Sequence, residues 1–294
     1  MKTNSAGERR QVVVNADDFG ISIPISDAIV ACHRAGSVSS TTLMVNMPGA
    51  RHAARLAADC PGLGVGLHFN LTLGAPVCGP ERVPALVDAH GQFHPRGTLM
   101  KRLLTGRVPR RQVRDELAAQ LDRFHSLELQ PTHIDSHQHV HVVPMVFDLV
   151  AETCTRAGIP IRVPWVTPIA GSRQSIGRRI RTSAMKAMIA VNRRRWRGLV
   201  SCNQSLGSLF DIDPGTERVT ADHYDRVLSA TSRAPLELMV HPIGDAADAD
   251  GLTSIGKLAQ AEGEFLATGQ LPALLAESGW DLVNFKSGKF PLLQ

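Results

Sequence analysis

The fold first becomes visible in the segment Gln11-Val12-Val13-Val14-Asn15-Ala16-Asp17-Asp18-Phe19-Gly20, where an apolar, β-branched run leads into two adjacent carboxylates. Short apolar runs rich in valine are typical of buried strands, so a strand is predicted over residues 11–16. Downstream, Pro24 at a first-turn position and Gly36 at a usual C-terminal position mark the two ends of a helix. The segment therefore predicts one strand–helix unit whose strand ends in acidic side chains.

The same alternation of apolar runs and helical spacing recurs along the chain, which is the pattern of a parallel sheet built from βα units. Further strands are predicted over residues 38–45, 63–69, 132–135, 159–163, 236–241 and 281–285, and further helices over residues 110–127, 144–157 and 221–231. About seven such units in 294 residues favour a barrel, because barrels commonly reach this size as one domain. The predicted fold class is α/β: an irregular or incomplete (β/α) barrel, TIM-like, with a single domain over residues 1–294.

Two segments interrupt this pattern and are predicted to be insertions. Residues 72–108 carry glycine, proline and turn signals without a clear period, and loops of this length in compact domains usually serve a function. Residues 165–210 form a basic helical insertion: no acid occurs between Glu152 and Asp211, whereas eleven Lys and Arg do.

Polar side chains that can bind metals follow four of the predicted strands. They are the Asp17-Asp18 pair, His68 with Asn70, the tract from His133 to His141, and His241. The tract alone holds four of the twelve histidines. Because the carboxyl ends of parallel strands meet at one rim, where α/β folds place their sites, we expect these side chains to converge.

Each of these elements also has a simpler interpretation, since adjacent aspartates can cap a turn and a histidine tract can be a solvated loop. Taken together they favour a metal site, in which imidazoles and a carboxylate hold one divalent cation and leave positions for water. A second carboxylate can accept the proton of that water, and a histidine opposite can protonate a departing amine. Neighbouring aspartates fit glycoside cleavage less well, because its carboxyl groups must flank the scissile bond.

The motifs Asn15–Gly20, Gly66–Thr72, Pro131–His141 and Glu237–Pro242 together resemble the YdjC/ChbG family of carbohydrate deacetylases. The resemblance implies an irregular barrel that hydrolyses the acetamide of an N-acetylated amino sugar with a bound divalent metal, Mg²⁺ or Zn²⁺. It implies that the metal ligands are Asp18, His68 and His137. It also implies that Asp17 is the catalytic base and His241 the catalytic acid.

Five further residues are candidates for substrate binding or for support of the metal ligands. His133 shares the strand parity of His137 and is a candidate partner or alternative ligand. His139 and His141 share that parity and are candidates for lining the sugar cleft, and Asn70 is placed with them. Arg162 could steady an oxyanion or a substrate hydroxyl, but a structural salt bridge explains it equally well.

The basic segment over residues 173–197 predicts an amphipathic helix whose apolar stripe is Ile176, Ile180, Ala184, Ala187, Met188 and Val191. Such a helix suits the surface of an anionic membrane, although a helix packed on the barrel with its arginines in water remains open. In the membrane interpretation the substrate is a lipid-linked N-acetylhexosamine, which we place ahead of soluble chitooligosaccharides.

Two other functions are alternatives for this sequence: a metal-dependent phosphoesterase and a nucleic-acid-binding module. A metal-dependent phosphoesterase would hold two ions with more carboxylates. A nucleic-acid partner is not expected, because aromatic residues make up only 4% of the chain and the metal-competent rim would have no purpose.

The five cysteines lack paired spacing and the polar start lacks a signal peptide, so a cytoplasmic protein is expected. In the membrane interpretation, it is peripheral at the inner membrane face. A homodimer is left open.

Overall fold

The computed structural model describes residues 9–165, 176–211, 216–231, 233–252 and 255–294. Its strands form one parallel sheet in the order β4-β3-β2-β1-β6-β5, with β7 paired to β1. The strands are β1 (Arg10–Phe19), β2 (Ser40–Leu43), β3 (Gly64–Phe69), β4 (Ile134–Ser136), β5 (Ser205–Gly207), β6 (Leu236–Val240) and β7 (Trp280–Leu282). The predicted incomplete α/β barrel is confirmed.

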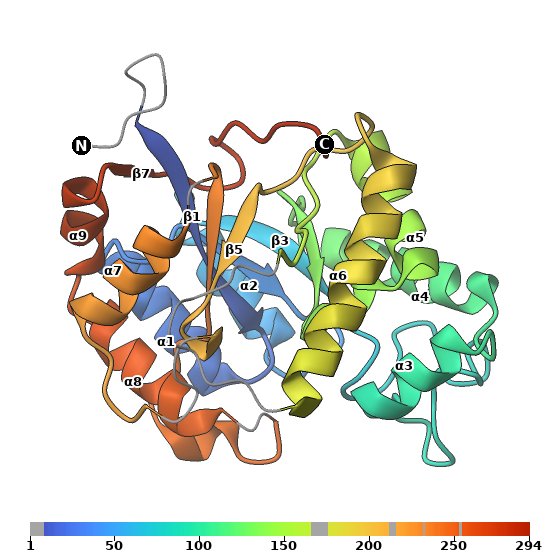
Figure 1. Cartoon of the computed structure of the whole chain (residues 1–294). Helices are drawn as coiled ribbons and strands as arrows, with labels where there is room; N and C mark the ends of the chain where they lie inside the picture. Colours follow the sequence, from blue (N-terminus) through green and yellow to red (C-terminus); the bar gives the residue numbers. More distant parts are fainter. Residues whose placement is uncertain (1–8, 166–175, 212–215, 232, 253–254) are drawn as a thin grey trace.

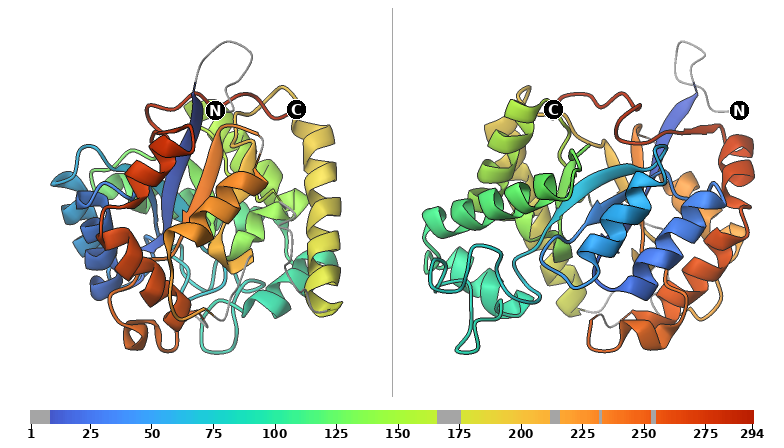
Figure 2. Two further views of the ribbon diagram at one scale, coloured as in Figure 1. Left: turned by 60° about the vertical axis from the view of Figure 1, so that its left-hand side comes forward. Right: turned by 180° about the vertical axis from the view of Figure 1, so that it is seen from behind.

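Helices surround this curved sheet (Figures 1 and 2). In the view of Figure 1, α1, α7, α8 and α9 lie to its left and α4, α5 and α6 to its right. The α-helices are α1 (Ile23–Arg34), α2 (Ala50–Ala58), α3 (Arg96–Leu104), α4 (Arg110–Ser126), α5 (Pro144–Ala157), α6 (Ile176–Trp196), α7 (Ala221–Ala230), α8 (Gly256–Ala267) and α9 (Leu271–Glu277). Short 3₁₀ turns are η1 (His137–Val142), η2 (Leu209–Asp211) and η3 (Ala246–Ala249).

The predicted strand over residues 159–163 is wrong. Among the described residues of this segment, only Ile161 joins the sheet, through single parallel bridges to Ile134 and Cys202. Pro160 and Pro164 flank the position, and proline cannot donate to a strand ladder. The segment therefore spans the gap between β4 and the residues before β5 without forming a strand, and β5 itself was not predicted.

Strand β1 runs three residues further than predicted and has an irregular end. Its register against β2 shifts between Ala16 and Phe19, and Asp18 adopts a left-handed φ of 68°. In a regular strand, consecutive side chains point to opposite faces, whereas a bulge redirects one of them. This irregularity allows two consecutive carboxylates, Asp17 and Asp18, to serve the same rim.

The long segment over residues 72–108 contains helix α3, which the sequence analysis missed. Only Leu99 and Leu103 of this helix are buried, so the sequence holds too few apolar residues at helical spacing to predict it. Helix α4 holds the rest of the segment through side chains that bind main-chain amides. The Glu116 carboxylate accepts hydrogen bonds from the amides of Val77 and Cys78.

Helix α6 confirms the predicted helix in the basic insertion, and its first three predicted residues, 173–175, lie outside the described residues. Its inner face is tied to the barrel: Asn192 donates to the Val142 carbonyl at 2.9 Å and Trp196 donates to Asp148 at 2.8 Å. Four members of the predicted apolar stripe instead face solvent, namely Ile180, Ala184, Ala187 and Val191. None of the helices in the described ranges is long and apolar enough to cross a bilayer.

Candidate metal centre and active site

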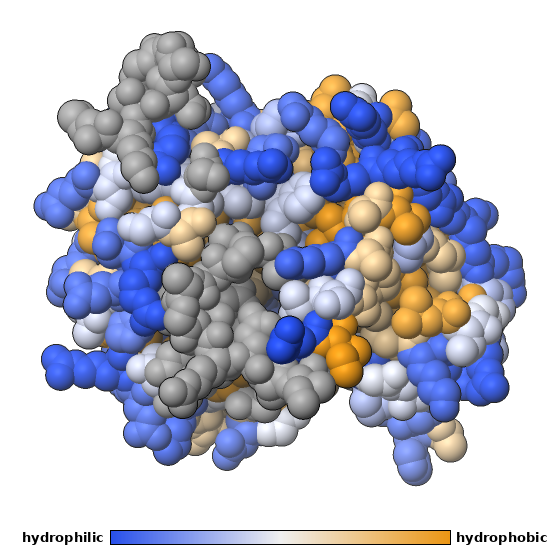
Figure 3. All heavy atoms as spheres, viewed as in Figure 1, coloured by the Kyte–Doolittle hydropathy of each residue, from blue (hydrophilic) through white to orange (hydrophobic). Residues whose placement is uncertain are grey.

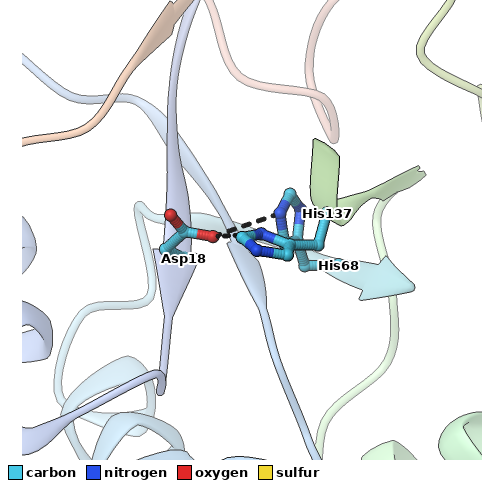
Figure 4. A group of neighbouring side chains, drawn as sticks. All are labelled: Asp18, His68 and His137. Carbon is cyan, nitrogen blue, oxygen red and sulfur yellow. Dashed lines mark hydrogen bonds and ion pairs between the residues drawn. The ribbon is translucent and has the colours of Figure 1, made fainter. Parts of the chain in front are cut away.

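Three buried side chains from separate strand ends converge at one point (Figure 4). The Asp18 Oδ1 atom of β1 lies 2.9 Å from Nδ1 of His137, at the start of η1. The same oxygen lies 3.3 Å from Nε2 of His68 on β3. The three predicted ligands thus offer one carboxylate oxygen and two imidazole nitrogens within reach of a single cation.

A hydrogen-bond network fixes the orientation of the His68 ring. Its Nδ1 lies 2.7 Å from Oδ1 of Asp135, and the Thr42 hydroxyl donates to the other oxygen of Asp135 at 3.1 Å. A carboxylate on one imidazole nitrogen is the usual means of directing the other nitrogen at a metal. Asp135 therefore holds His68 with Nε2 facing Asp18, a role that the sequence analysis did not assign.

The spacing of the donor atoms fits a divalent cation. Ligands at the usual 2.0–2.2 Å from a tetrahedral zinc ion stand about 3.3–3.6 Å apart, close to the separations found around Asp18. Burial by itself would raise the pKa of the Asp18 carboxyl, but His137 and His68 hold it well below its usual range. The carboxylate is therefore ionised at neutral pH, as a metal ligand must be.

Asp17 is held beside this cluster by a buried arginine. Both oxygens of Asp17 accept hydrogen bonds at 2.6 Å from the terminal nitrogens of Arg162. Arg162 is fully buried and also bonds Asp135 at 2.7 Å and Glu237 at 2.8 Å. Burial raises the pKa of Asp17, but the Arg162 charge outweighs it and leaves this pKa lowered.

His241 follows β6, which pairs with β1 on the side opposite β2, β3 and β4 in the sheet order. Its Nε2 is 3.9 Å from Oδ2 of Asp17, and its side chain keeps 16% of its surface exposed. The edge of the Phe210 ring packs against the imidazole, with ring centroids 5.2 Å apart. The structure therefore brings together all five residues predicted for catalysis and metal binding.

Comparison with known proteins places the chain in a family. The model of the YdjC-like protein family matches residues 11–277, and this range contains every residue of the cluster. The chain belongs to the YdjC-like family. The predicted resemblance is thereby confirmed.

Relatives of this YdjC-like chain include proteins named carbohydrate deacetylase and chitooligosaccharide deacetylase. It is 49% identical over 153 residues to the carbohydrate deacetylase of Geobacillus stearothermophilus, covering 52% of this chain and 59% of the relative. It is 44% identical over 157 residues to the chitooligosaccharide deacetylase of Proteus mirabilis, covering 52% and 58%. The matched region thus spans less than two thirds of either relative.

A solved structure supports the fold of the YdjC-like chain. A candidate cellobiose-phosphate cleavage protein of Enterococcus faecalis V583 superposes with a TM-score of 0.74 at 24% identity. The superposition covers 95% of this chain and 99% of the other. At this identity, the likeness establishes a shared architecture.

Four of the five supporting candidates in the YdjC-like chain are fully buried and offer no surface to a sugar. His133 stacks on Phe285, with ring centroids 3.7 Å apart, and its Nδ1 lies 3.0 Å from the Thr132 hydroxyl. The ring nitrogens of His141 meet the Ser136 hydroxyl and the Arg162 carbonyl. Full burial excludes His141 from the predicted sugar cleft. The predicted role of His133, as a partner of the metal ligands or an alternative ligand, stays a prediction.

Asn70 and Arg162 are likewise fully buried, and their side chains bind protein groups. The Asn70 side-chain oxygen accepts hydrogen bonds from the amides of Thr72 and Leu73, so it shapes the start of the long segment. Arg162 fills the salt-bridge role that the sequence had left open. His139 remains a candidate for the cleft: it is half-buried, has a φ of 57°, and its Nδ1 has no hydrogen-bond partner among the described residues.

A second group in the described residues could also hold a cation, formed by Asp17, His68 and Asp135. It shares His68 with the first group, and the Arg162 guanidinium already bonds both of its carboxylates. A cation there would have to displace that positive charge. The geometry therefore favours one ion, not the pair expected of a phosphoesterase.

Glu237 gives a testable prediction of pH dependence. Burial raises its pKa to about 7, against the lowering effect of Arg162. A carboxyl with a raised folded-state pKa loses stability as pH rises from the unfolded value, near 4.5, through the folded value. Glu237→Gln should therefore stabilise the protein by on the order of 3 kcal/mol at pH 8, and much less near pH 4.5.

Urea unfolding of both proteins at the two pH values measures this effect. The amide retains an oxygen for the Arg162 hydrogen bond, and the paired measurement cancels the titration of groups that do not interact with Glu237. A stability difference that is the same at both pH values would contradict the assigned pKa.

Proposed function

We propose that this protein is a divalent-metal-dependent deacetylase that hydrolyses the acetamide of an N-acetylated amino sugar. The observation that carries the proposal is the convergence of Asp18, His68 and His137 beside Asp17 and His241. The names of the deacetylases among its relatives support the same reaction. The proposal covers the activity, the metal requirement and the substrate class.

The cation would be held by Asp18, His68 and His137. When bound, such a cation polarises the acetamide carbonyl as a Lewis acid and lowers the pKa of water. Two imidazoles and one carboxylate favour Zn²⁺ over Mg²⁺, because magnesium prefers an all-oxygen shell. We therefore infer one zinc-like ion per chain.

Asp17 is the proposed general base and His241 the proposed general acid. Asp17 is ionised at neutral pH and can accept the proton of the attacking water. His241, near Asp17, donates a proton to the sugar nitrogen as the carbon–nitrogen bond breaks. This proton is required because an amide anion does not leave at neutral pH.

The substrate is proposed to be a lipid-linked N-acetylhexosamine, with soluble chitooligosaccharides as the alternative. The outward stripe of α6 favours the lipid: Ile180 is 65% exposed and Val191 45% exposed. Figure 3 shows apolar side chains gathered right of centre, where α6 lies in Figure 1, with hydrophilic side chains around them. The exposed basic residues of α6 include Arg179, Arg181, Lys186 and Arg194. An exposed apolar stripe with flanking cations suits an anionic bilayer surface.

Mass spectrometry on N-acetylhexosamine compounds tests the proposed reaction. The panel holds free, oligomeric and lipid-linked forms, and deacetylation removes about 42 mass units as the acetyl group is replaced by hydrogen. Loss from the lipid-linked compound alone supports the preferred substrate, and loss from the soluble oligomers alone selects the alternative. No loss from any compound, with the ion bound, would overturn the deacetylase proposal.

The membrane contact predicts the behaviour of a double variant. Ile180→Ser with Val191→Ser should lower binding to phosphatidylglycerol vesicles about tenfold, because two exposed apolar contacts are lost. The arginines are a poorer target, since Arg195 pairs with Asp148 at 2.7 Å and Arg193 bonds the Gln294 carbonyl. Changing them would disturb folding as well as charge.

Vesicle cosedimentation is the measurement, with Ile23→Ser and Leu292→Ser as the matched control. These residues are 52% and 50% exposed, but Ile23 begins α1 and Leu292 lies in the C-terminal segment after β7. Equal binding by both double variants would remove the membrane argument. If the Ile180→Ser and Val191→Ser changes halve the mass of the protein in solution, the apolar stripe instead joins two copies of the chain.

A further inference from the structure

A buried glutamate contacts the main chain at His241, and the proposed reaction steps give this glutamate no role. Glu262 lies on α8 and is 1% exposed. One of its oxygens accepts a hydrogen bond from the His241 amide at 2.6 Å, and the other accepts from the Tyr224 hydroxyl at 3.1 Å. Both oxygens thus have defined partners.

Helix α8 is packed tightly against the residues that follow His241. A side chain at Gly263 would come within 2.3 Å of the Ile243 carbonyl oxygen, so the helix backbone directly abuts this loop. The Ile243 amide also donates to the Ala259 carbonyl at 3.3 Å. Glu262 is therefore anchored on a rigid support that holds the end of β6 at close range.

The imidazole of His241 has little else to fix it. Its Nδ1 is buried and has no hydrogen-bond partner in the described part of the chain, unlike Nδ1 of His68. Its Nε2 lies 3.9 Å from Asp17, beyond hydrogen-bond distance. The direction of the ring is therefore set by the position of its main chain and by the Phe210 contact.

We infer that Glu262 is a positioning residue for His241, holding its main-chain amide so that the imidazole faces the reacting nitrogen. The inference rests on the proposed function, since it assigns His241 the role of proton donor. Tyr224 completes the arrangement, because its hydroxyl occupies the second oxygen of Glu262 and fixes the rotamer of the carboxylate. An error of about 1 Å in a catalytic group can cost a hundredfold in rate.

Nuclear magnetic resonance tests the contact itself, whatever the substrate proves to be. In protein labelled with ¹⁵N-histidine, the His241 amide proton should resonate far downfield and move upfield in Glu262→Ala. Glu262→Gln should restore most of the shift, because its amide oxygen can accept the same hydrogen bond. Glu264→Ala is the matched control, since Glu264 lies two residues along α8 but is exposed. An unmoved His241 resonance in Glu262→Ala would overturn the inference.

Kinetics then separate positioning from general damage. Glu262→Ala should lower kcat for the sugar amide about tenfold or more and leave hydrolysis of 4-nitrophenyl acetate unchanged, because nitrophenolate leaves without a proton. Glu262→Gln should recover the amide rate. An equal fall for both substrates would overturn the positioning role. A wild-type protein that deacetylates no sugar would count against the proposed function, while the His241 resonance would still decide the contact.

Discussion

Asp17→Asn is expected to lower turnover by about two to four orders of magnitude while the protein retains its divalent ion. The amide has nearly the same shape as the carboxylate but cannot accept the proton of the attacking water. The three proposed ligands are unchanged, because Asp18, His68 and His137 do not depend on Asp17 for their contacts with one another. Steady-state acetate release and metal content by mass spectrometry measure the two effects separately.

The control for this variant is Glu237→Gln. Glu237 also binds Arg162 and is also buried, but its side chain lies outside the cluster of proposed ligands. The comparison is made at about pH 8.5, where Glu237 is ionised. If the loss in Asp17→Asn came only from the altered charge around Arg162, Glu237→Gln would lose activity to a similar extent at this pH. Near-normal activity in Glu237→Gln with low activity in Asp17→Asn supports the base assignment. Near-normal activity in Asp17→Asn would show that another group accepts the proton.

His137→Ala is expected to lose both the ion and the activity. Removing a group that merely supports a ligand typically weakens metal affinity by 10–100-fold, so removal of a ligand should cost at least about a hundredfold. The His137 ring also shields Asp18, which keeps only 12% of its side chain exposed. Competition with a zinc-binding dye gives the affinity, and acetate release gives the activity.

His139→Ala is the matched control on the same turn. It removes an identical side chain two residues along, and His139 is not in the group of possible ligands that forms around Asp18 in the described residues. This variant should bind the ion normally, even if its affinity for the sugar falls. Tight metal binding by His137→Ala would exclude the proposed ligand set, and weak binding by both variants would point to damage of the whole turn.

The regular elements could be predicted because their signals are local. Helix α5 occupies the predicted residues 144–157, since Pro144 begins it and Gly158, with a φ of 67°, ends it. Strand β3 and strand β6 likewise match their predicted segments to within one residue at each end. Apolar runs, proline and glycine act within a few residues of their position, so the sequence is sufficient to locate them.

Irregular elements could not be predicted because their causes lie elsewhere in the chain. The register shift in β1 is defined by its pairing with β2, and no residue within β1 predicts it. The single bridges of Ile161 likewise depend on Ile134 and Cys202. The contact between Glu262 and the His241 amide joins residues 21 positions apart on different elements, and Glu262 has no motif to mark it.

The sequence by itself determined the βα order and hence that Asp17, Asp18, His68, His137 and His241 share one rim, because every strand of a parallel sheet ends on the same side. Only the tertiary structure decided which of the other polar residues are closed to solvent: Arg162, His133, His141 and Asn70 are all fully buried. Buried polar groups must find partners, and those partners come from distant segments that meet only when the barrel forms. The order of strands and helices along the chain can therefore predict that a side chain lies at the rim. Its contacts with distant residues are known only from the folded structure.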